Sequence, residues 1–506
     1  MIINAASART LLCLASLVLC GMARGQDAPD PDEEVVDGEA ELDDLFDDGL
    51  DDLLGGGWAA ADEAESDSSE QDFDDFDDFD DLDALLGGGS TDEENDSVLV
   101  SWKGFVELRP RGYWADRHQG RDDDQLLLEA EFEFDYRFSE QLSGYFRPRL
   151  FTDLRNKDHA RTEPYEAYLT WDAESWDLRA GQFVENWGIV DTVNPIDVIN
   201  RRDLGTDFLD PKRLGELGIR WRTFGEGGDT WGEPTLSLYA LPEFRFPNFP
   251  DDDGRFSFDG LAGTFFENDG FEPHGHEEIF VASRFNATLE TAPFNADVQL
   301  LAARGPERSP TIAFVAGPGS AVIPVAYGVN TIGGGFRAVA NEDALGHLLA
   351  SLTFKFEVAH KSPYSFSGSP VATPDAYTTY VLGVDRTFYG ITDDQDQLTV
   401  TVEYIEETGA HDLTAMLRPL SSDVVLRTFW EANDFDRTSL ELRIIEDTQA
   451  SERIAELIYE TQLRSIDEDL KLIFQLQAFD QATAAAGGFG FFPDNSSAAI
   501  GLRWEF

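Results

Sequence analysis

Residues 126–138 read Leu-Leu-Leu-Glu-Ala-Glu-Phe-Glu-Phe-Asp-Tyr-Arg-Phe, and this stretch decides the fold class. Apolar side chains occupy every second position from Leu128 to Phe138, and the positions between them are charged. Successive side chains of a β-strand point to opposite faces, so the alternation predicts a strand with one apolar and one charged face. A soluble sandwich would bury the apolar row, whereas a membrane barrel would turn it toward lipid.

The same alternation recurs from Val98 to the C-terminus. We predict about eighteen strands, with sixteen as the alternative, at approximately 100–114, 125–138, 142–153, 162–172, 175–186, 215–224, 234–243, 277–290, 293–304, 329–340, 346–360, 375–388, 396–407, 422–432, 437–447, 452–464, 468–479 and 496–506. Tight turns such as 139–141 alternate with long connections such as 187–214 and 244–276. Short turns at one end and long loops at the other are the plan of outer-membrane barrels. The predicted fold class is therefore all-β, a transmembrane antiparallel β-barrel over residues 98–506.

The last strand gives a second indication of the membrane. Ile500, Leu502, Trp504 and Phe506 form its apolar row, and Phe506 is the final residue. A terminal aromatic strand of this kind resembles the recognition signal that the barrel-assembly machinery reads. We therefore expect a location in the bacterial outer membrane, with outer-membrane lipid and the assembly machinery as partners.

The N-terminus reads as a secretory signal. Arg9 precedes a short apolar run over 11–22, and we interpret residues 1–25 as a cleaved signal peptide. Both cysteines, Cys13 and Cys20, lie within it, so the mature chain would have no disulfide, thiolate metal site or Cys nucleophile. No later apolar stretch approaches the length of about eighteen residues that a transmembrane helix needs.

Charge is very unevenly distributed along the chain. The whole sequence has 99 acidic and 37 basic residues, a net charge of −62, which excludes nucleic acid as a partner because phosphate binding needs clustered Lys and Arg. Residues 26–96 alone hold 31 acidic side chains and no Lys or Arg. Such a composition cannot bury enough apolar surface to offset its ordering entropy, so we predict a disordered acidic segment over 26–97.

The acidic segment contains one element twice, each copy ending in three glycines at 55–57 and 87–89. The apolar residues of the two copies are Leu45, Phe46, Leu50, Leu53 and Leu54, and Phe73, Phe76, Phe79, Leu82, Leu85 and Leu86. On a helix the second set falls largely on one face, with carboxylates on the other. We predict that the repeats dock a periplasmic or inner-membrane transporter and fold on binding. A solvated spacer or a weak cation-binding tail is the alternative.

The charged rows of the predicted strands would face the barrel interior. The residues that we predict to follow the solute path are Arg109, Arg147, Arg149, Arg179, Arg220 and Arg222. The last three are expected to be the main group facing an anion. The alternative is that the charged groups only solvate one another in a water-filled lumen.

The connection over 187–214 is unusual for an external loop because it combines turn formers with Ile196, Val198 and Ile199. We predict that it folds into the barrel mouth and constricts it. The predicted constriction residues are Trp187, Asp191, Asn194, Pro195, Asp197, Asn200, Arg201 and Arg202. An ordered external cap is the alternative.

The pattern Gly-Gln…Trp-Gly…Asn-Pro-x-Asp-x-x-Asn-Arg-Arg-Asp, starting at Gly181, resembles a family of outer-membrane β-barrels of poorly defined function that are often encoded beside transporters of the resistance-nodulation-division superfamily. The resemblance covers the barrel and is most specific over 175–215. It implies export or lipid-type trafficking together with an inner-membrane transporter, and it names no substrate.

The function we expect is an outer-membrane transport barrel that moves or hands over a solute or lipid-like substrate with the docked transporter. A general diffusion porin with a passive tail is the alternative, and a rim-active hydrolase is a third possibility. None of the seven His residues lies in a recognisable Ser/His arrangement, so we predict no catalytic residues. No cofactor and no metal site is predicted, because two His in one loop, His274 and His276, are a weak signal.

Overall fold

The computed structural model describes residues 99–506 except 115–123, 156–160, 206–208, 229, 251–254, 257–264, 267–269, 292–293, 310, 316–320, 341–351, 371, 393–394, 410–419, 450–451 and 482–494. The predicted signal peptide and the predicted disordered segment with its two repeats lie outside the described residues.

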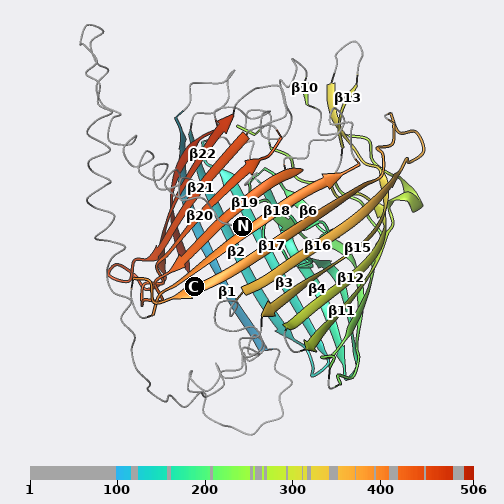
Figure 1. Cartoon of the computed structure of the whole chain (residues 1–506), viewed down its shortest axis with the longest axis horizontal. Coiled ribbons are helices and arrows are strands. Elements are labelled where there is room, and N and C mark those ends of the chain that lie inside the picture. Colours follow the sequence, from blue (N-terminus) through green and yellow to red (C-terminus); the bar gives the residue numbers. More distant parts are fainter. Residues whose placement is uncertain are drawn as a thin grey trace. The chain divides into compact units, whose positions relative to one another are not determined.

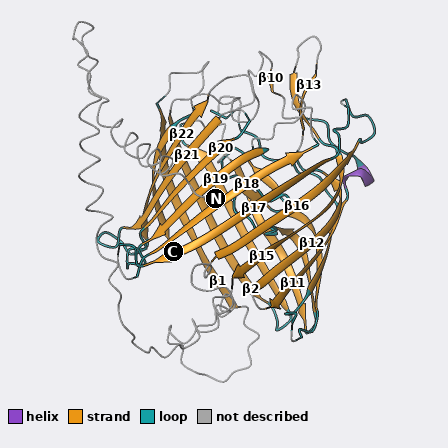
Figure 2. Ribbon diagram, viewed as in Figure 1, coloured by secondary structure: helices purple, strands orange, loops and turns teal. Residues whose placement is uncertain are grey.

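Eighteen strands form one closed antiparallel sheet (Figures 1 and 2). They are β1 (Leu99–Tyr113), β2 (Asp124–Arg137), β3 (Leu142–Asp153), β4 (Arg161–Ala173), β5 (Trp176–Phe183), β8 (Glu216–Phe224), β9 (Thr235–Leu241), β11 (Phe280–Thr291), β12 (Phe294–Pro306), β15 (Gly328–Ala340), β16 (Leu352–Tyr364), β17 (Tyr377–Tyr389), β18 (Gln397–Thr408), β19 (Ser422–Glu431), β20 (Ser439–Asp447), β21 (Glu452–Gln462), β22 (Leu470–Gln481) and β23 (Ser497–Glu505). Pairing of β1 with both β2 and β23 closes the barrel. Each predicted strand overlaps one of these, so the prediction of eighteen strands is confirmed and the alternative of sixteen is wrong.

The outer face of the barrel is apolar. Large side chains such as Leu300, Ile332 and Ile500 are 55%, 69% and 51% exposed on strands β12, β15 and β23. The charged rows of the same sheet point inward, as on β2, where Glu129 and Glu131 are buried. An apolar outer face with an inward charged face is the arrangement of a transmembrane barrel. No helix among the described residues has the length and apolar character to cross a membrane.

The connections differ between the two ends of the barrel. Residues 138–141, 174–175 and 463–469 are short turns at one end, whereas 184–215, 242–279 and 307–327 join strands at the other. The long connections contain small elements that the sequence did not predict: β6 (Arg201–Asp203), β7 (Lys212–Leu214), β10 (Phe265–Phe266), a 3-10 turn (Gly275–Glu278), β13 (Thr311–Val315) and β14 (Ala321–Val325). They are too short to carry a period-two signal.

The final residue closes the sheet. The Gly104 amide donates to the Phe506 carbonyl at 2.8 Å, and the Phe506 amide donates back to Gly104 at 3.0 Å. The Phe506 ring lies 5.4 Å from the Trp102 ring and 5.7 Å from the Phe132 ring, centroid to centroid. A side chain at Gly104 would meet the Glu131 carbonyl at 2.5 Å, so glycine permits this close approach. The apolar row ending in Phe506 is therefore part of the seam between the first and last strands.

Candidate functional site: an inner loop and the cavity beside it

Residues 184–215, here called the inner loop, connect β5 to β8. Two carboxylates on the far wall accept hydrogen bonds from its backbone. Glu403 on β18 accepts from the amides of Asp191 at 2.7 Å and Thr192 at 2.9 Å. Glu357 on β16 accepts from the amides of Ile189 and, at 3.1 Å, Val190.

Both of these carboxylates lie on the inward face of the barrel. Glu357 and Glu403 are fully buried, whereas the neighbouring Val402 is 45% exposed on the outer face of the same strand as Glu403. The inner loop therefore contacts the inside of the wall. Lys355, two residues before Glu357, adds an ion pair to Asp191 at 2.9 Å and another to Asp385.

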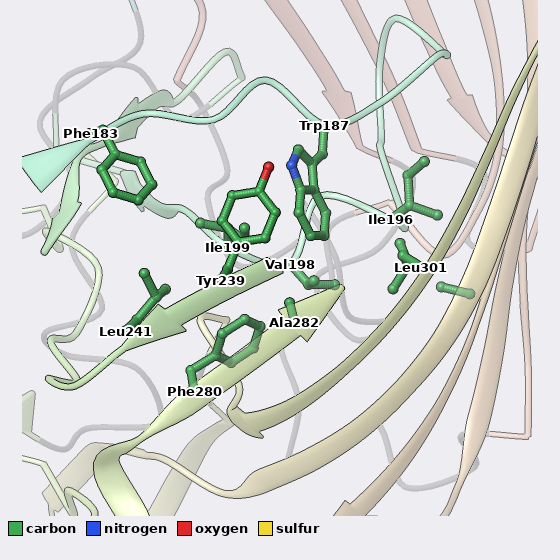
Figure 3. Packing of buried hydrophobic residues seen from close by; sticks show 11 residues of the cluster. Phe183, Trp187, Ile196, Val198, Ile199, Tyr239, Leu241, Phe280, Ala282 and Leu301 are labelled. Carbon is green, nitrogen blue, oxygen red and sulfur yellow. The ribbon is translucent and has the colours of Figure 1, made fainter. Parts of the chain in front are cut away.

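Apolar packing fixes the inner loop against β9, β11 and β12. Trp187 is fully buried, and its ring meets Tyr239 edge-on at 5.1 Å. Figure 3 shows Trp187 and Ile199 of the inner loop gathered with barrel residues such as Phe280. On the opposite side Val190 packs into a second cluster formed by Val381, Ile405, Val425, Ile445 and Ile454 of strands β17 to β21.

Glycines make room for the inner loop. A Cβ at Gly335 on β15 would lie 3.0 Å from Ile189, and one at Gly333 would lie 3.2 Å from Ile196. Within the loop, Gly188 has φ of +137°, and a Cβ there would lie 1.8 Å from the Asn194 side chain. Glycine is the residue that adopts this conformation without strain. With its amide nitrogen turned toward Val190, Asn194 donates to the carbonyl of Val190 at 2.8 Å.

The returning half of the inner loop, which includes β6 and β7, is held by ion pairs. Asp203 pairs with Arg149 and with Arg161, each at 3.0 Å, and Lys212 reaches Glu129 at 2.5 Å. Burial lowers the pKa of Arg202 from its ordinary value, although the nearby Asp197 carboxylate opposes the shift. These contacts join the inner loop to the wall formed by β2, β3 and β4.

All eight predicted constriction residues lie in the inner loop, which reaches the barrel interior rather than only its mouth. Trp187, Asp191 and Asn194 make the wall and loop contacts described above, and Pro195 is buried. Asn200 links the two halves of the loop through the Glu185 amide and the Leu214 carbonyl, each at 3.0 Å. Arg201 lies 3.5 Å from Glu216, and Asp197 pairs with Arg202 at 2.6 Å. That the loop narrows the solute path remains a prediction.

A cavity of about 570 Å³ lies between the inner loop and the wall formed by β1 to β4 and β21 to β23. Seven of its lining residues are basic, namely Arg109, Arg147, Arg149, Arg202, Lys212, Arg213 and Arg503. Five are acidic, namely Glu107, Glu129, Asp210, Glu456 and Glu460. The lining thus has an excess of two positive charges in a chain whose net charge is −62.

The ion pairs around the cavity are asymmetric. In the pair of Arg147 with Glu131 the arginine side chain is 27% exposed and the carboxylate 4%. The lysine is likewise the more exposed partner in the pair of Lys212 with Glu129, where the side chains are 38% and 11% exposed. In the pair of Arg149 with Glu129 the arginine is the more buried partner. Glu131 and Glu129 are therefore more buried than Arg147 and Lys212, whereas the lining carboxylate Glu460 is more exposed than its partner Lys471.

The structure divides the six arginines predicted for the solute path. Arg109, Arg147 and Arg149 line the cavity together. The other three are not among its lining residues, and each is paired: Arg220 lies 2.9 Å from Asp177 and 2.8 Å from Glu185, Arg222 lies 2.6 Å from Asp177, and Arg179 lies 3.8 Å from Glu185. Their expected place as the main anion-facing group remains a prediction.

Sequence reasoning did not single out several residues of this site. Lys212 and Arg213 lie in the loop without a recognisable spacing, whereas the three consecutive glycines at 333–335 inside a strand were a usable signal for close approach of another backbone. Within the described ranges, no three His, Cys, Asp or Glu side chains are placed to hold one metal ion.

No protein-family model matches the sequence, and no curated protein matches it. Among solved structures, OccK11 (OpdR) of Pseudomonas aeruginosa is 12% identical, with 80% of this chain and 95% of that chain covered at a TM-score of 0.43. OccAB3 of Acinetobacter baumannii is 10% identical over 80% and 99% of the two chains, at a TM-score of 0.42. Wzi of Escherichia coli, an outer-membrane carbohydrate-binding β-barrel involved in group 1 capsule assembly, is 11% identical over 80% and 84%, at a TM-score of 0.45. Since identities this low compare folds alone, the function proposed below rests on the chain's own residues.

Proposed function

We propose that this chain is a bacterial outer-membrane channel for small anionic solutes. The observation that carries the proposal is the excess of basic side chains around the 570 Å³ cavity, where Glu107 and Glu131 are more buried than the arginines they hold. An excess of one sign of charge between low-dielectric walls raises the local concentration of counter-ions. The apolar outer face supports the membrane location.

The charge of the cavity favours a small anion over the lipid-like substrate that the family resemblance implies. The acidic segment over 26–96 would then hold a periplasmic or inner-membrane transporter that receives or delivers the solute. Support for this docking comes from the duplicated Asp/Leu/Phe element. Without a partner the same barrel would act as a general diffusion porin.

The test is ion selectivity of the purified chain in planar bilayers, measured as the reversal potential across a potassium chloride gradient. We expect chloride to be preferred over potassium. Lys212→Glu, which places a carboxylate at the cavity, should reduce or reverse this preference. The matched control is Lys103→Glu, because Lys103 is an exposed lysine of β1 that is not among the cavity-lining residues. A cation preference of the unaltered chain would contradict the proposal.

A further inference from the structure

One buried carboxylate on the barrel wall holds two guanidinium groups at the cavity. Glu107 accepts from Arg109 Nε at 2.5 Å and from Arg503 Nε at 2.8 Å. Arg503 lies directly opposite Glu107 in the register of β1 and β23, and Arg109 is two residues along the inward row of β1. We call these three residues the wall clamp.

The inner loop carries the same arrangement. Asp197 Oδ2 accepts from Arg202 Nη2 and from Arg213 Nε, each at 2.6 Å. Arg202 and Arg213 are cross-strand neighbours in the hairpin of β6 and β7. We call Asp197, Arg202 and Arg213 the loop clamp.

Each clamp has one net positive charge and turns its cations toward the cavity. The carboxylates of Glu107 and Asp197 are 2% and 0% exposed, whereas the four arginine side chains are 20–29% exposed. All four arginines line the cavity. A guanidinium has five N–H donors, and the carboxylate of each clamp uses only some of them. The remaining donors can bind a carboxylate or phosphate, the partners that arginine recognises best.

Each of the other three cations of the cavity has at least one carboxylate partner that no clamp uses. Arg147 pairs with Glu131, and Arg149 and Lys212 share Glu129. Arg149 also pairs with Asp203, which holds Arg161 as well. The clamps are therefore two separate places, one on the wall and one on the loop, where two guanidinium groups share one carboxylate. Apolar side chains, among them Ile458 and Ile473, complete the lining.

We propose that the two clamps together bind a dicarboxylate, one carboxylate in each, with its hydrocarbon body against the apolar part of the lining. The inference deepens the proposed function and rests on it. A monocarboxylate would engage only one clamp and leave the other unpaired. The chain should therefore discriminate by the number of anionic groups and by the distance between them.

The test uses straight-chain dicarboxylates of increasing length and monocarboxylates of matched length as blockers of the chloride current in planar bilayers. We expect one length of dicarboxylate to block at a concentration about tenfold or more below that of the matched monocarboxylate, because the second clamp adds charge-assisted hydrogen bonds. Arg503→Gln and Arg213→Gln should each reduce the advantage of the dicarboxylate over the matched monocarboxylate to about twofold or less. Lys103→Gln, outside the cavity, should leave the advantage intact.

Equal block by the two series at every length would overturn the inference in the unaltered chain, whatever the variants do. An advantage that survives both Arg503→Gln and Arg213→Gln would overturn the assignment to the clamps, provided that heat-modifiable gel mobility shows folded barrels. Chloride selectivity without dicarboxylate discrimination would reject only this inference. Cation selectivity would reject the proposed function as well.

Discussion

Simultaneous replacement of Glu357 and Glu403 by Ala is expected to release residues 189–192 from the barrel wall. In the folded chain these two side chains accept hydrogen bonds from four consecutive amides, those of Ile189, Val190, Asp191 and Thr192. Since Ala offers no acceptor, all four bonds are lost together.

The free energies of these contacts indicate that residues 189–192 would leave the wall in the double variant. A hydrogen bond contributes about 0.5–1.5 kcal/mol, and about 1.5–3 kcal/mol where the acceptor is ionised, so the four together contribute several kcal/mol. Ordering four residues costs about 4–8 kcal/mol of backbone entropy. Without the carboxylates, burial of Val190 in its cluster contributes about 1.5–3 kcal/mol and the partly exposed Lys355–Asp191 ion pair about 0–1 kcal/mol, which together are smaller than that cost. The intact chain therefore holds the segment in place, and the double variant does not.

Single-channel conductance in planar bilayers measures the effect. We expect a larger conductance and greater current noise in the double variant, because a freed segment no longer occupies a fixed position inside the barrel. Glu441→Ala is the control, because it removes another inward carboxylate that forms ion pairs with Arg427 and Arg443 on the wall. If the double variant folds and conducts like the unaltered chain, residues 189–192 do not limit the current, and the constriction hypothesis fails.

Three further outcomes follow from particular residues. Deleting Phe506 removes the two backbone hydrogen bonds to Gly104 and the ring contacts at the seam. Assembly of the barrel should therefore slow several-fold, and protease-sensitive protein should accumulate. An unchanged time course of heat-modifiable gel mobility would count against this prediction. Burial opposes ionisation of Asp396 in the 390–396 turn, but hydrogen bonds from Thr392 and Trp430 outweigh it and hold the pKa of Asp396 well below its ordinary value. The resulting stabilisation is present above the unfolded-state pKa of about 3.9 and is lost as the pH falls through the folded-state pKa. We therefore expect Asp396→Asn to lower the melting temperature at pH 7 and to have a smaller effect near pH 2. Equal effects at both pH values would refute this reasoning. In the second acidic repeat, the apolar stripe to be replaced by Ser consists of Phe73, Phe76, Phe79 and Leu82. The replacement should weaken capture of a transporter from envelope extracts and leave barrel folding unchanged. If capture stays normal and only added salt reverses it, the repeat is a charged spacer.

The barrel could be predicted from the sequence because its signals are local. Alternation with period two assigns each strand residue to the lipid or the lumen, and the turns at 138–141 and 174–175 are short enough to force neighbouring strands to pair. The apolar row ending in Phe506 and the unusual composition of the inner loop were visible in the same way. Eighteen strands, the inward charged rows and a distinctive connection after β5 were therefore accessible from the sequence.

The partners of the inner loop were not accessible. Asp191 and Glu403 are 212 positions apart in the sequence. Alternation predicts that Glu403 faces inward, but it does not predict the position of Glu403 around the barrel or its depth within it. The same holds for the cavity, where Arg109 and Arg503 meet only because the first and last strands pair, and Arg202 and Arg213 meet only because a short hairpin forms inside the lumen. Alternation along each strand was enough to tell which side chains face the interior. Which of them gather into a cation-rich cavity was decided by barrel closure and by the course of the inner loop, because both depend on contacts between residues far apart along the chain.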